Sequence, residues 1–503
     1  MLPYALSFRS AAMPWGAGTA TLDITPSEPA WQSGYAHRSA KSTGVLQPLR
    51  AKALAIRSAG GALAVLVTLD LVGVSREMSA EVSRRLGAFA GVEPDAVRVV
   101  ASHTHSGPSL ASELRKPQVL NDLRTSEAEA AAVRAYTAFV VDQAHDAAVA
   151  AVGQIAEASL AVGVTEVGFA TNRRRNTEER LSPETMRGMW AQCQCCVAPA
   201  LPDGRKGPAD HTVDVLRFLA ADDGRALAVV YGYACHNTVL DGSLISGDWS
   251  GFASEAVEAA LPSCTAFFVP GCGGDQNPVY RRSEDLARTW GGVMASAVVE
   301  LVRGAAMDDV APTAELAVAR SQLELPLERL PSGAEIGAMR DTARAAEDLC
   351  PTLVPENYDA VAAAKLNANT GADLVPLIKE AKRQWADLME AGDMAASVPF
   401  YISTWAFGLS FLWVALSDEP VVAYAERIRQ LAPAAHVMAT GYSDSVSIYI
   451  PSETVLLEGG YEGGENAMWY GKAGKFQAGV EGAIVGECAK QIAEVGRARE
   501  TDH

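Results

Sequence analysis

The sequence predicts a mixed α/β fold in which internal β-sheets are flanked by helices. Ala62–Leu71 is a continuous apolar run of strand length, and Val97–Val100 is a second run, rich in β-branched residues. Between them Met78, Val82 and Leu86 recur at helical spacing and form one apolar face. Strand, helix and strand in succession build open α/β sheets, and such sheets bind ligands where their strands end.

The same alternation continues along the rest of the chain. Residues from about 330 to 395 are rich in Ala, Glu and Lys with helical periodicity, which predicts a helical segment laid on the body of the fold. We expect residues 1–503 to form one large body. Further helices are predicted at about 127–152, 252–261, 286–302 and 480–495, and further strands at 213–219, 226–234, 265–269, 407–416, 437–440 and 446–450.

The overall charge excludes some classes of partner. The chain of 503 residues carries a formal net charge of −18. A nucleic-acid-binding protein needs a basic surface to neutralise phosphates, and attraction to anionic lipid headgroups needs the same. The charge therefore argues against both partners and indicates nothing positive about a substrate.

The lack of a recognisable targeting signal in this sequence, together with its cysteine usage, predicts a cytoplasmic protein. The apolar stretch Leu2–Phe8 is too short for a signal peptide, and no uncharged apolar run reaches the roughly 18 residues of a transmembrane helix. The eight cysteines do not form a disulfide framework for a chain of this length, which favours a reducing compartment. Cys193, Cys195 and Cys196 are crowded together, and either free thiols or a soft-metal site would explain them.

The most informative motif is Ser102–Pro108, which contains His103 and His105 directly after the predicted strand Val97–Val100. Residues two apart on a strand point to the same face, so the two imidazoles emerge side by side before Gly107 and Pro108 turn the chain away. The motif alone leaves two interpretations open. It is either a metal or catalytic site, or a pair of polar strand-end residues satisfied by backbone groups.

A third histidine favours the first interpretation, a metal or catalytic site. His236 follows the predicted strand at 226–234, and Ser246–Asp248 then forms a polar turn that opens a helix. Zinc in hydrolases takes imidazole and carboxylate ligands and keeps a position open for water. Spacing alone cannot choose the carboxylate among the 60 acidic residues of the chain.

A series of motifs then follows in a fixed order along nearly the whole chain. They are Ala17–Pro26, Gly34–Arg38, Thr68–Leu71, Ser102–Pro108, Asn172–Arg174, His236 with Ser246–Asp248, Leu416–Pro420, Tyr449, Tyr461–Gly463 and Tyr470–Gly471. On these motifs the chain resembles the neutral/alkaline ceramidase family of zinc amidases. Each motif is weak alone, and their number and order make the resemblance specific.

The resemblance implies a metal site and substrate contacts at matching positions. One zinc ion per chain would be bound by His103, His236, Glu419 and Tyr449. The family's substrate-contacting positions fall on three residues, which are His105, Arg173 and Tyr461. Without the resemblance, Glu419 would be interpreted as an acidic residue at a helix N-terminus, which the helix dipole favours. The two tyrosines would be interpreted as aromatic residues of the core or its rim. Arg173 would be interpreted as part of a solvated run of arginines.

The chemistry of a zinc hydrolase suggests a role for each group. His105 is a candidate proton shuttle to the leaving amine, and either Tyr449 or Arg173 would stabilise the oxyanion. Asp70 and Asp248 are candidates for orienting the ligand imidazoles from behind.

The chain departs from the family in two respects. Where ceramidases have a serine to which a nucleophilic role is assigned, this chain has Gly271-Cys272-Gly273-Gly274-Asp275. Either zinc-bound hydroxide attacks the substrate or Cys272 substitutes, and we favour hydroxide, with Gly271 and Cys272 supplying backbone donors to the substrate. Ceramidases also continue into an immunoglobulin-like domain, whereas this sequence stops soon after the Tyr470 motif.

These observations predict one ceramidase-like zinc hydrolase domain that cleaves a C–N amide bond of an N-acyl, lipid-like or other small amide through a zinc-bound hydroxide. A zinc esterase or lactonase is the alternative, because esters share the tetrahedral chemistry. A non-catalytic ligand-binding relative also stays open. A serine hydrolase is disfavoured because no Gly-x-Ser-x-Gly elbow occurs. The sequence leaves the substrate, the native metal and any homo-oligomer undetermined.

Overall fold

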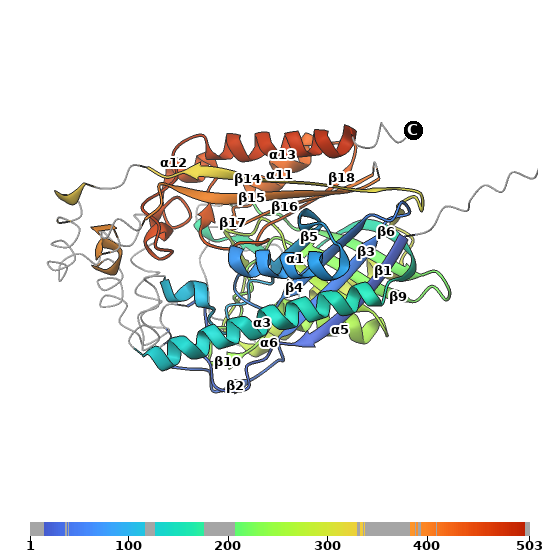
Figure 1. The fold of residues 1–503 in the computed structure, drawn as a ribbon, viewed down its shortest axis with the longest axis horizontal. Helices are drawn as coiled ribbons and strands as arrows, with labels where there is room; N and C mark the ends of the chain where they lie inside the picture. The colour runs from blue at the N-terminus through green and yellow to red at the C-terminus, as the bar shows by residue number, and fades with distance from the viewer. Residues whose placement is uncertain are drawn as a thin grey trace, which may run out of the picture.

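The structure, a computed structural model, has two sheet layers. The structure describes residues 15–115, 126–175, 207–328 and 394–497 apart from positions 36, 37, 39 and 409, together with short pieces between 332 and 390. The larger sheet comes from the first three of these ranges and the smaller sheet from the later part of the chain (Figure 1). The mixed α/β architecture predicted from the sequence is confirmed.

The larger sheet contains nine strands within the described residues, in the order β11-β9-β8-β6-β1-β3-β4-β5, with β13 paired to β6. Strands β4 and β5 run parallel, as do β9 and β11, and the other neighbours are antiparallel. The bounds are β1 Trp15–Asp23, β3 Arg50–Arg57, β4 Leu63–Leu69, β5 Val97–Ala101, β6 Ala156–Glu166, β8 Thr212–Ala220, β9 Ala226–Tyr233, β11 Thr265–Pro270 and β13 Asp308–Asp309.

Helices α1 (Arg76–Ala90) and α3 (Glu127–Gly153) pack together, and α3 also packs against β1, β3 and β4 (Figure 1). The buried face of α3 is built from alanines, which lets its backbone approach the sheet closely. Gly18 on β1 shows how close the approach is, because a Cβ at this position would collide with the carbonyl oxygen of Ala151 on α3. The other helix pair, α5 (Asp248–Ala260) and α6 (Glu284–Arg303), packs on β11, β6 and β8.

The smaller sheet has the order β14-β15-β16-β18. Helix α13 (Val480–Arg497) lies along its outer face, and α11 (Ala423–Leu431) packs between α13 and β18 (Figure 1). The strands of the smaller sheet are β14 Leu316–Pro326, β15 Ser397–Phe407, β16 Phe411–Leu416 and β18 His436–Thr440.

Short elements complete the described fold. The short strands are β2 Gly44–Val45, β7 Ala170–Asn172, β10 Leu244–Ile245, β12 Gln276–Pro278, β17 Glu419–Pro420 and β19 Tyr449–Ile450. The short helices are α12 Glu453–Glu458 and the 3₁₀ turns η1 Pro94–Ala96, η2 Ala111–Arg115, η3 Arg173–Arg175 and η4 Glu465–Met468.

The prediction of one strand over 407–416 is wrong. Gly408 has φ of 58° and turns the chain between β15 and β16, so the apolar run is the second half of a hairpin. The strand predicted at 446–450 is also shorter than expected, because only Tyr449–Ile450 pairs. The four further helices predicted from the sequence all occur, within a few residues of their expected bounds.

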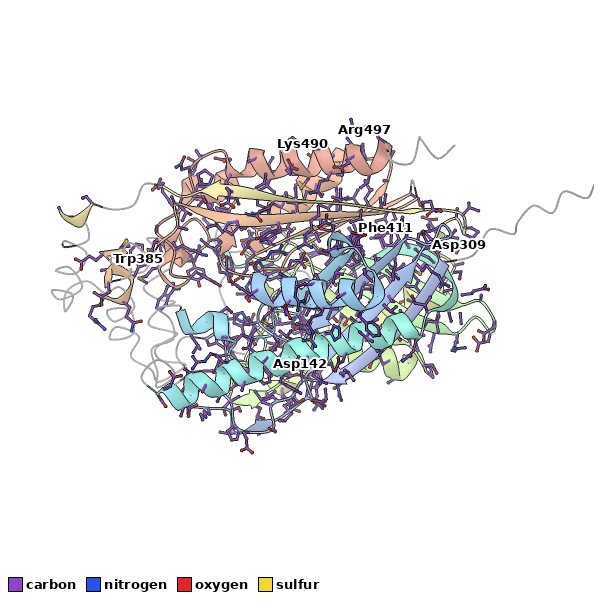
Figure 2. The ribbon with its side chains drawn as sticks, viewed as in Figure 1. Asp142, Asp309, Trp385, Phe411, Lys490 and Arg497 are labelled. Carbon is purple, nitrogen blue, oxygen red and sulfur yellow. The ribbon has the colours of Figure 1, made fainter. Side chains whose placement is uncertain are left out.

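The space between the two layers is filled by side chains, including Phe411 (Figure 2). One buried cation also joins the layers. Arg98 on β5 is fully buried, and its guanidinium lies 4.2 Å from the ring of Trp405 and 4.5 Å from the ring of Trp413. Its Nη2 donates to the carbonyl oxygen of Ser403 at 2.9 Å.

None of the described helices is both long enough and apolar enough to cross a membrane. The helical segment predicted at 330–395 falls largely outside the described residues.

The packing of Arg98 yields a stability prediction. Arg98→Ala should lower the free energy of unfolding by about 3 kcal/mol, because it opens a cavity between two tryptophans and removes their cation–π partner. Arg98→Met keeps most of the side-chain volume without a buried charge, so it should lower the free energy of unfolding by much less. Urea unfolding followed by tryptophan fluorescence measures both. Equal losses in the two variants would contradict this account of the contact.

Candidate metal centre

The centre forms where two strands of the larger sheet end. His103 follows β5 and His236 follows β9, and these strands stand far apart in the strand order. Their carboxyl ends are nevertheless joined, because Thr104 and Asn237 form a parallel bridge. The backbone N–H of His105 donates to the carbonyl oxygen of Asn237 at 3.1 Å. This bridge brings the two histidine segments of the sequence together.

Backbone carbonyls fix the orientation of two imidazoles. Nδ1 of His103 donates to the carbonyl oxygen of Val72 at 2.5 Å. Nδ1 of His236 lies 2.8 Å from the carbonyl oxygen of Gly273 and 3.1 Å from that of Gln276. With both Nδ1 atoms used in this way, each Nε2 presents its lone pair to the centre.

His105 completes a cluster of three imidazoles. Its Nε2 lies 3.1 Å from Nε2 of His103, and ligand atoms of His103, His105 and His236 all lie within 4.8 Å of one another. Gly34 allows this packing, because it has φ of 94° and its hydrogen faces the ring of His105. A Cβ at Gly34 would lie 2.5 Å from Nδ1 of His105.

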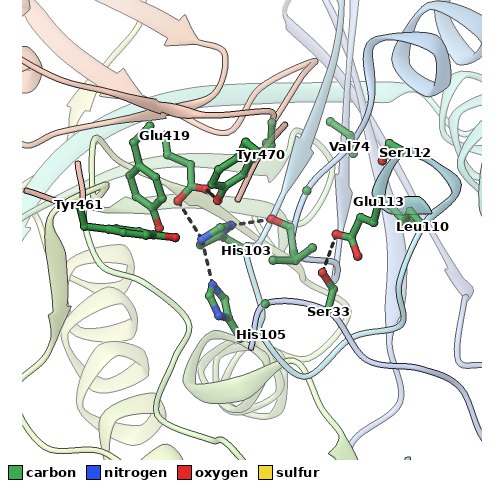
Figure 3. Close-up of a pocket in the computed structure, with 15 residues that line it drawn as sticks. Ser33, Val74, His103, His105, Leu110, Ser112, Glu113, Glu419, Tyr461 and Tyr470 are labelled. Atoms are coloured by element: carbon green, nitrogen blue, oxygen red, sulfur yellow. Dashed lines mark hydrogen bonds and ion pairs between the residues drawn. The ribbon is translucent and has the colours of Figure 1, made fainter. Parts of the chain in front are cut away.

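The short strand β17, which follows the smaller sheet's strand β16 in the chain, contributes a carboxylate. The turn after β16 brings Glu419 over the imidazoles, with Oε2 at 3.2 Å from Nε2 of His103 and 3.4 Å from Nε2 of His236 (Figure 3). Glu419 is fully buried, and its Oε2 accepts no hydrogen bond from the residues that the structure describes. Its Oε1 accepts a hydrogen bond from the hydroxyl of Tyr470 at 2.6 Å.

Tyr449 stands beside Glu419 because β17 pairs with β19 in parallel, with these two residues opposite each other. The Tyr449 hydroxyl lies 3.1 Å from Nε2 of His236. The structure therefore brings together all four residues predicted as metal ligands, from both layers of the fold.

The spacing of these donor atoms suits a metal ion. Zinc bonds to nitrogen and oxygen are about 2.0–2.1 Å long, so neighbouring ligand atoms of a tetrahedral ion lie about 3.3 Å apart. The separations of 3.2 and 3.4 Å from Glu419 Oε2 and of 3.1 Å from the Tyr449 hydroxyl match this value. An unsatisfied buried carboxylate oxygen facing two imidazole nitrogens is otherwise costly. The residues fit a divalent cation.

Protonation states in the cluster favour the same interpretation. Burial, followed by the nearby Arg173 charge, lowers the pKa of His236 to about 4. Burial and the two neighbouring imidazoles hold the pKa of His105 well below its usual value. For Glu419, burial raises the pKa, but His103 and His236 together outweigh it, and the pKa is well below its usual value. Burial therefore favours neutral imidazoles at His105 and His236, and the neutral imidazole is the form that binds metal.

Arg173 is held at the edge of the centre. It begins η3, directly after β7, and its Nε donates to Glu462 at 2.7 Å. Its Nη1 lies 3.3 Å from Nε2 of His236, and its guanidinium lies 5.2 Å from the ring of Tyr449. The ion pair with Glu462 fixes the direction of the guanidinium, so its charge is aimed at the centre.

A pocket opens over this cluster (Figure 3). Tyr461 and Tyr470 form one side of it, and a wall made by η2 and the segment before it forms the other. The lining residues are Ser33, Gly34, Val72, Gly73, Val74, His103, His105, Leu110, Ser112, Glu113, Glu419, Val446, Tyr449, Tyr461 and Tyr470. The predicted substrate-contacting residues His105 and Tyr461 both line this pocket.

Comparison with known proteins identifies the family of the chain. The profile of the neutral/alkaline non-lysosomal ceramidase N-terminal domain matches residues 15–281. The chain belongs to this family. Family membership and fold indicate a hydrolase, and the three-histidine cluster is a possible metal site of such an enzyme.

Two solved structures share the fold. Neutral ceramidase from Pseudomonas aeruginosa superposes with a TM-score of 0.66 at 18% identity, covering 97% of this chain and 75% of the other. A ceramidase described as complexed with C2 superposes with a TM-score of 0.65 at 17% identity, covering 97% of this chain and 76% of the other. No curated protein matches the sequence.

Two predicted orienting residues do not reach the imidazoles. Asp70 accepts a hydrogen bond from the backbone N–H of Arg50 at 2.9 Å. Asp248 accepts from the backbone N–H groups of Val239 and Leu240 at 3.1 and 2.8 Å, so it shapes the loop after His236 and touches no ring. The expectation of carboxylate partners is corrected, because backbone carbonyls already occupy both Nδ1 positions.

Gly271 and Cys272 do not line the pocket. A Cβ at Gly271 would lie 2.9 Å from the backbone nitrogen of Ala234, so even the Cβ of a serine would be crowded there. Cys272 is fully buried in the apolar cluster under the smaller sheet, where burial raises the pKa of its thiol. The geometry thus gives neither residue the substrate contact predicted for it, and it gives Cys272 no nucleophilic position.

This glycine loop has a different role, which is to position ligands. The carbonyl oxygen of Gly273 orients His236, and the N–H of Gly274 donates to the carbonyl oxygen of Pro420 at 2.9 Å. A Cβ at Gly274 would lie 2.5 Å from the carbonyl oxygen of Glu419. The loop is therefore packed between the end of β9 and the turn that carries the carboxylate.

Sequence reasoning missed several contributors. Tyr470 and Glu462 lie in recognised motifs, but nothing in their spacing shows that they contact Glu419 and Arg173. The carbonyl of Val72 leaves no signal in a sequence. Cys193, Cys195 and Cys196 lie outside the described residues.

The packing of Gly274 can be tested. Gly274→Ala should weaken metal affinity by at least about tenfold, because the added methyl group displaces the turn that carries Glu419. Gly292→Ala is a matched control, since a Cβ there meets open space on α6, and it should leave metal affinity unchanged. Competition against a chromophoric chelator measures both. Unchanged affinity in Gly274→Ala would show that the loop does not position the carboxylate.

Proposed function

We propose that the protein is a zinc-dependent amidase that hydrolyses the C–N bond of an N-acyl, lipid-like or other linear amide. The observation that supports this most directly is the bare, buried Oε2 of Glu419 facing Nε2 of both His103 and His236. Family membership supports a hydrolase that acts on amides.

His103, His236, Glu419 and Tyr449 would hold the zinc ion, one per chain. A bound zinc ion would lower the pKa of a water ligand towards about 7 and polarise a substrate carbonyl. His103 and His236 follow strands of the larger sheet, whereas Glu419 and Tyr449 lie on the β17–β19 pair in the other layer, so the site exists only when both layers are folded together.

His105 is the proposed proton carrier. It lines the pocket, its low pKa keeps it neutral at physiological pH, and its Nδ1 has no hydrogen-bond partner within the described ranges of the chain. A neutral imidazole beside the scissile bond can accept a proton from the attacking water and return it to the leaving amine.

Arg173 is the proposed stabiliser of negative charge on the tetrahedral oxygen. Glu462 fixes its guanidinium, and Tyr449 and Tyr461 flank it at 5.2 and 5.8 Å. Preorganised donors of this kind contribute a few kcal/mol to transition-state binding. The Tyr449 hydroxyl could share this role.

Water is the proposed nucleophile, because Gly271 carries no hydroxyl and the Cys272 thiol is buried away from the pocket. Esters pass through the same tetrahedral geometry, so assays should include them. Cytoplasmic localisation stays a prediction.

Metal removal tests the proposal. The purified protein should contain about one zinc per chain and hydrolyse a chromogenic amide or ester, and chelation should abolish the activity. Glu419→Ala should lose both metal and activity, while Glu93→Ala, at an exposed position, should retain both. A metal-free protein without hydrolytic activity would instead point to a ligand-binding relative.

A second prediction separates chemistry from metal binding. His105→Ala should keep one zinc per chain and lower kcat by about 10²–10⁴, because the proton carrier is lost. Full turnover in this variant would exclude His105 as the acid–base group. Loss of zinc would show that His105 is itself a metal ligand.

A further inference from the structure

The pocket over the candidate metal centre contains a second buried carboxylate, Glu113. It lines the same cavity as His103 and Glu419 but lies on the opposite wall, near Leu110 and Ser112 (Figure 3). No motif of the family resemblance includes it, and no step of the proposed hydrolysis uses it.

Local structure fixes this side chain at the pocket wall. Glu113 sits in η2, where its N–H donates to the carbonyl oxygen of Leu110 at 2.9 Å. The hydroxyl of Ser33 donates to Oε1 of Glu113 at 2.5 Å, and the N–H of Ser33 donates to the carbonyl oxygen of Gly107 at 3.0 Å. The Ser33–Gly34 segment that packs on His105 therefore also holds Glu113.

Among the described residues, the pocket offers no basic side chain opposite the Glu113 carboxyl group. Glu113 is only 4% exposed, and the residues that line the pocket include no lysine and no arginine. In the part of the chain that the structure describes, no basic side chain forms an ion pair with it. Glu419 carries a second negative charge in the same cavity, where the imidazoles face it.

Physical chemistry makes this arrangement costly unless a ligand completes it. A carboxylate has about four lone-pair sites and here receives one hydroxyl donor. Burying an ionised group without an opposite charge is strongly unfavourable. A cation bound in the pocket would form charge-assisted hydrogen bonds with Glu113 and relieve the cost.

We propose that Glu113 selects substrates that carry a protonated amine on the part of the molecule that extends from the scissile bond towards η2. Val74 and Leu110 also line the cavity, and their apolar side chains would pack against methylene groups of such a substrate. The proposal rests on the proposed function, since the metal centre fixes the position of the scissile bond.

Hydroxamates test this without a known substrate, because a hydroxamate group binds a catalytic metal and anchors the tail in the pocket. The probes are ω-aminoalkanoyl hydroxamates of increasing chain length. Each is paired with an alkanoyl hydroxamate in which a methyl group replaces the ammonium group. Calorimetry on the zinc-loaded protein gives the affinity of each pair.

For at least one chain length, the wild type should bind the ammonium compound about tenfold or more tightly than its neutral partner, as expected for a partly buried ion pair. Glu113→Gln should lose this preference while binding the neutral partner as well as the wild type does. Glu93→Gln, which removes an exposed carboxylate, should keep the preference. Ser33→Ala should retain it too, because the carboxylate remains.

Two results would overturn the proposal. One is equal binding of both compounds at every chain length, and the other is a preference that survives in Glu113→Gln. In either case, chelator-sensitive binding of the neutral hydroxamates would leave the metal centre intact and refute the role of Glu113 alone. If no hydroxamate binds, the metal centre fails and the proposal fails with it.

Discussion

The approach of Glu419 to His103 and His236 is the constraint on which the rest of the structure depends. Three ionisable groups are buried together, and Oε2 of Glu419 lies 3.2 Å from Nε2 of His103 and 3.4 Å from Nε2 of His236. His103 and His236 follow strands of the larger sheet, and Glu419 lies on β17, directly after the smaller sheet's strand β16. The contact therefore requires the layers to dock in one register, which the packing of Arg98 against Trp405 and Trp413 helps to set.

The backbone around this contact is strained in the way expected of a preorganised site. The backbone φ angles of His103, Asp418 and Tyr442 are 61°, 61° and 56°. Residues other than glycine rarely adopt this left-handed backbone region. Tyr442 packs on the imidazole of His103 at 4.5 Å, and its N–H donates to the carbonyl oxygen of Asp418 at 2.9 Å. Strain is thus concentrated next to the candidate ligands, and the glycine loop supplies the close approach that a Cβ would prevent.

Much of this centre was accessible from the sequence, and the reason differs from residue to residue. His103, His105 and His236 follow apolar runs that end abruptly, so local pattern placed them at strand ends. Glu419 and Tyr449 carry no such signal, and only ordered resemblance to a family identified them. Asp70 and Asp248 show where reasoning from residue type fails, because the sequence cannot reveal that a backbone carbonyl already occupies Nδ1. Glu113 was missed since its role depends on a wall formed by segments distant in the chain.

The most direct test of the account is a crystal structure of the metal-loaded protein, with anomalous diffraction recorded on both sides of the zinc absorption edge. The account predicts a single strong anomalous peak per chain, bonded to His103, His236, Glu419 and Tyr449 at about 2.0–2.2 Å. It also predicts His105 unbonded beside the metal. Absence of a peak, or a metal held by the three histidines with Glu419 turned away, would contradict it.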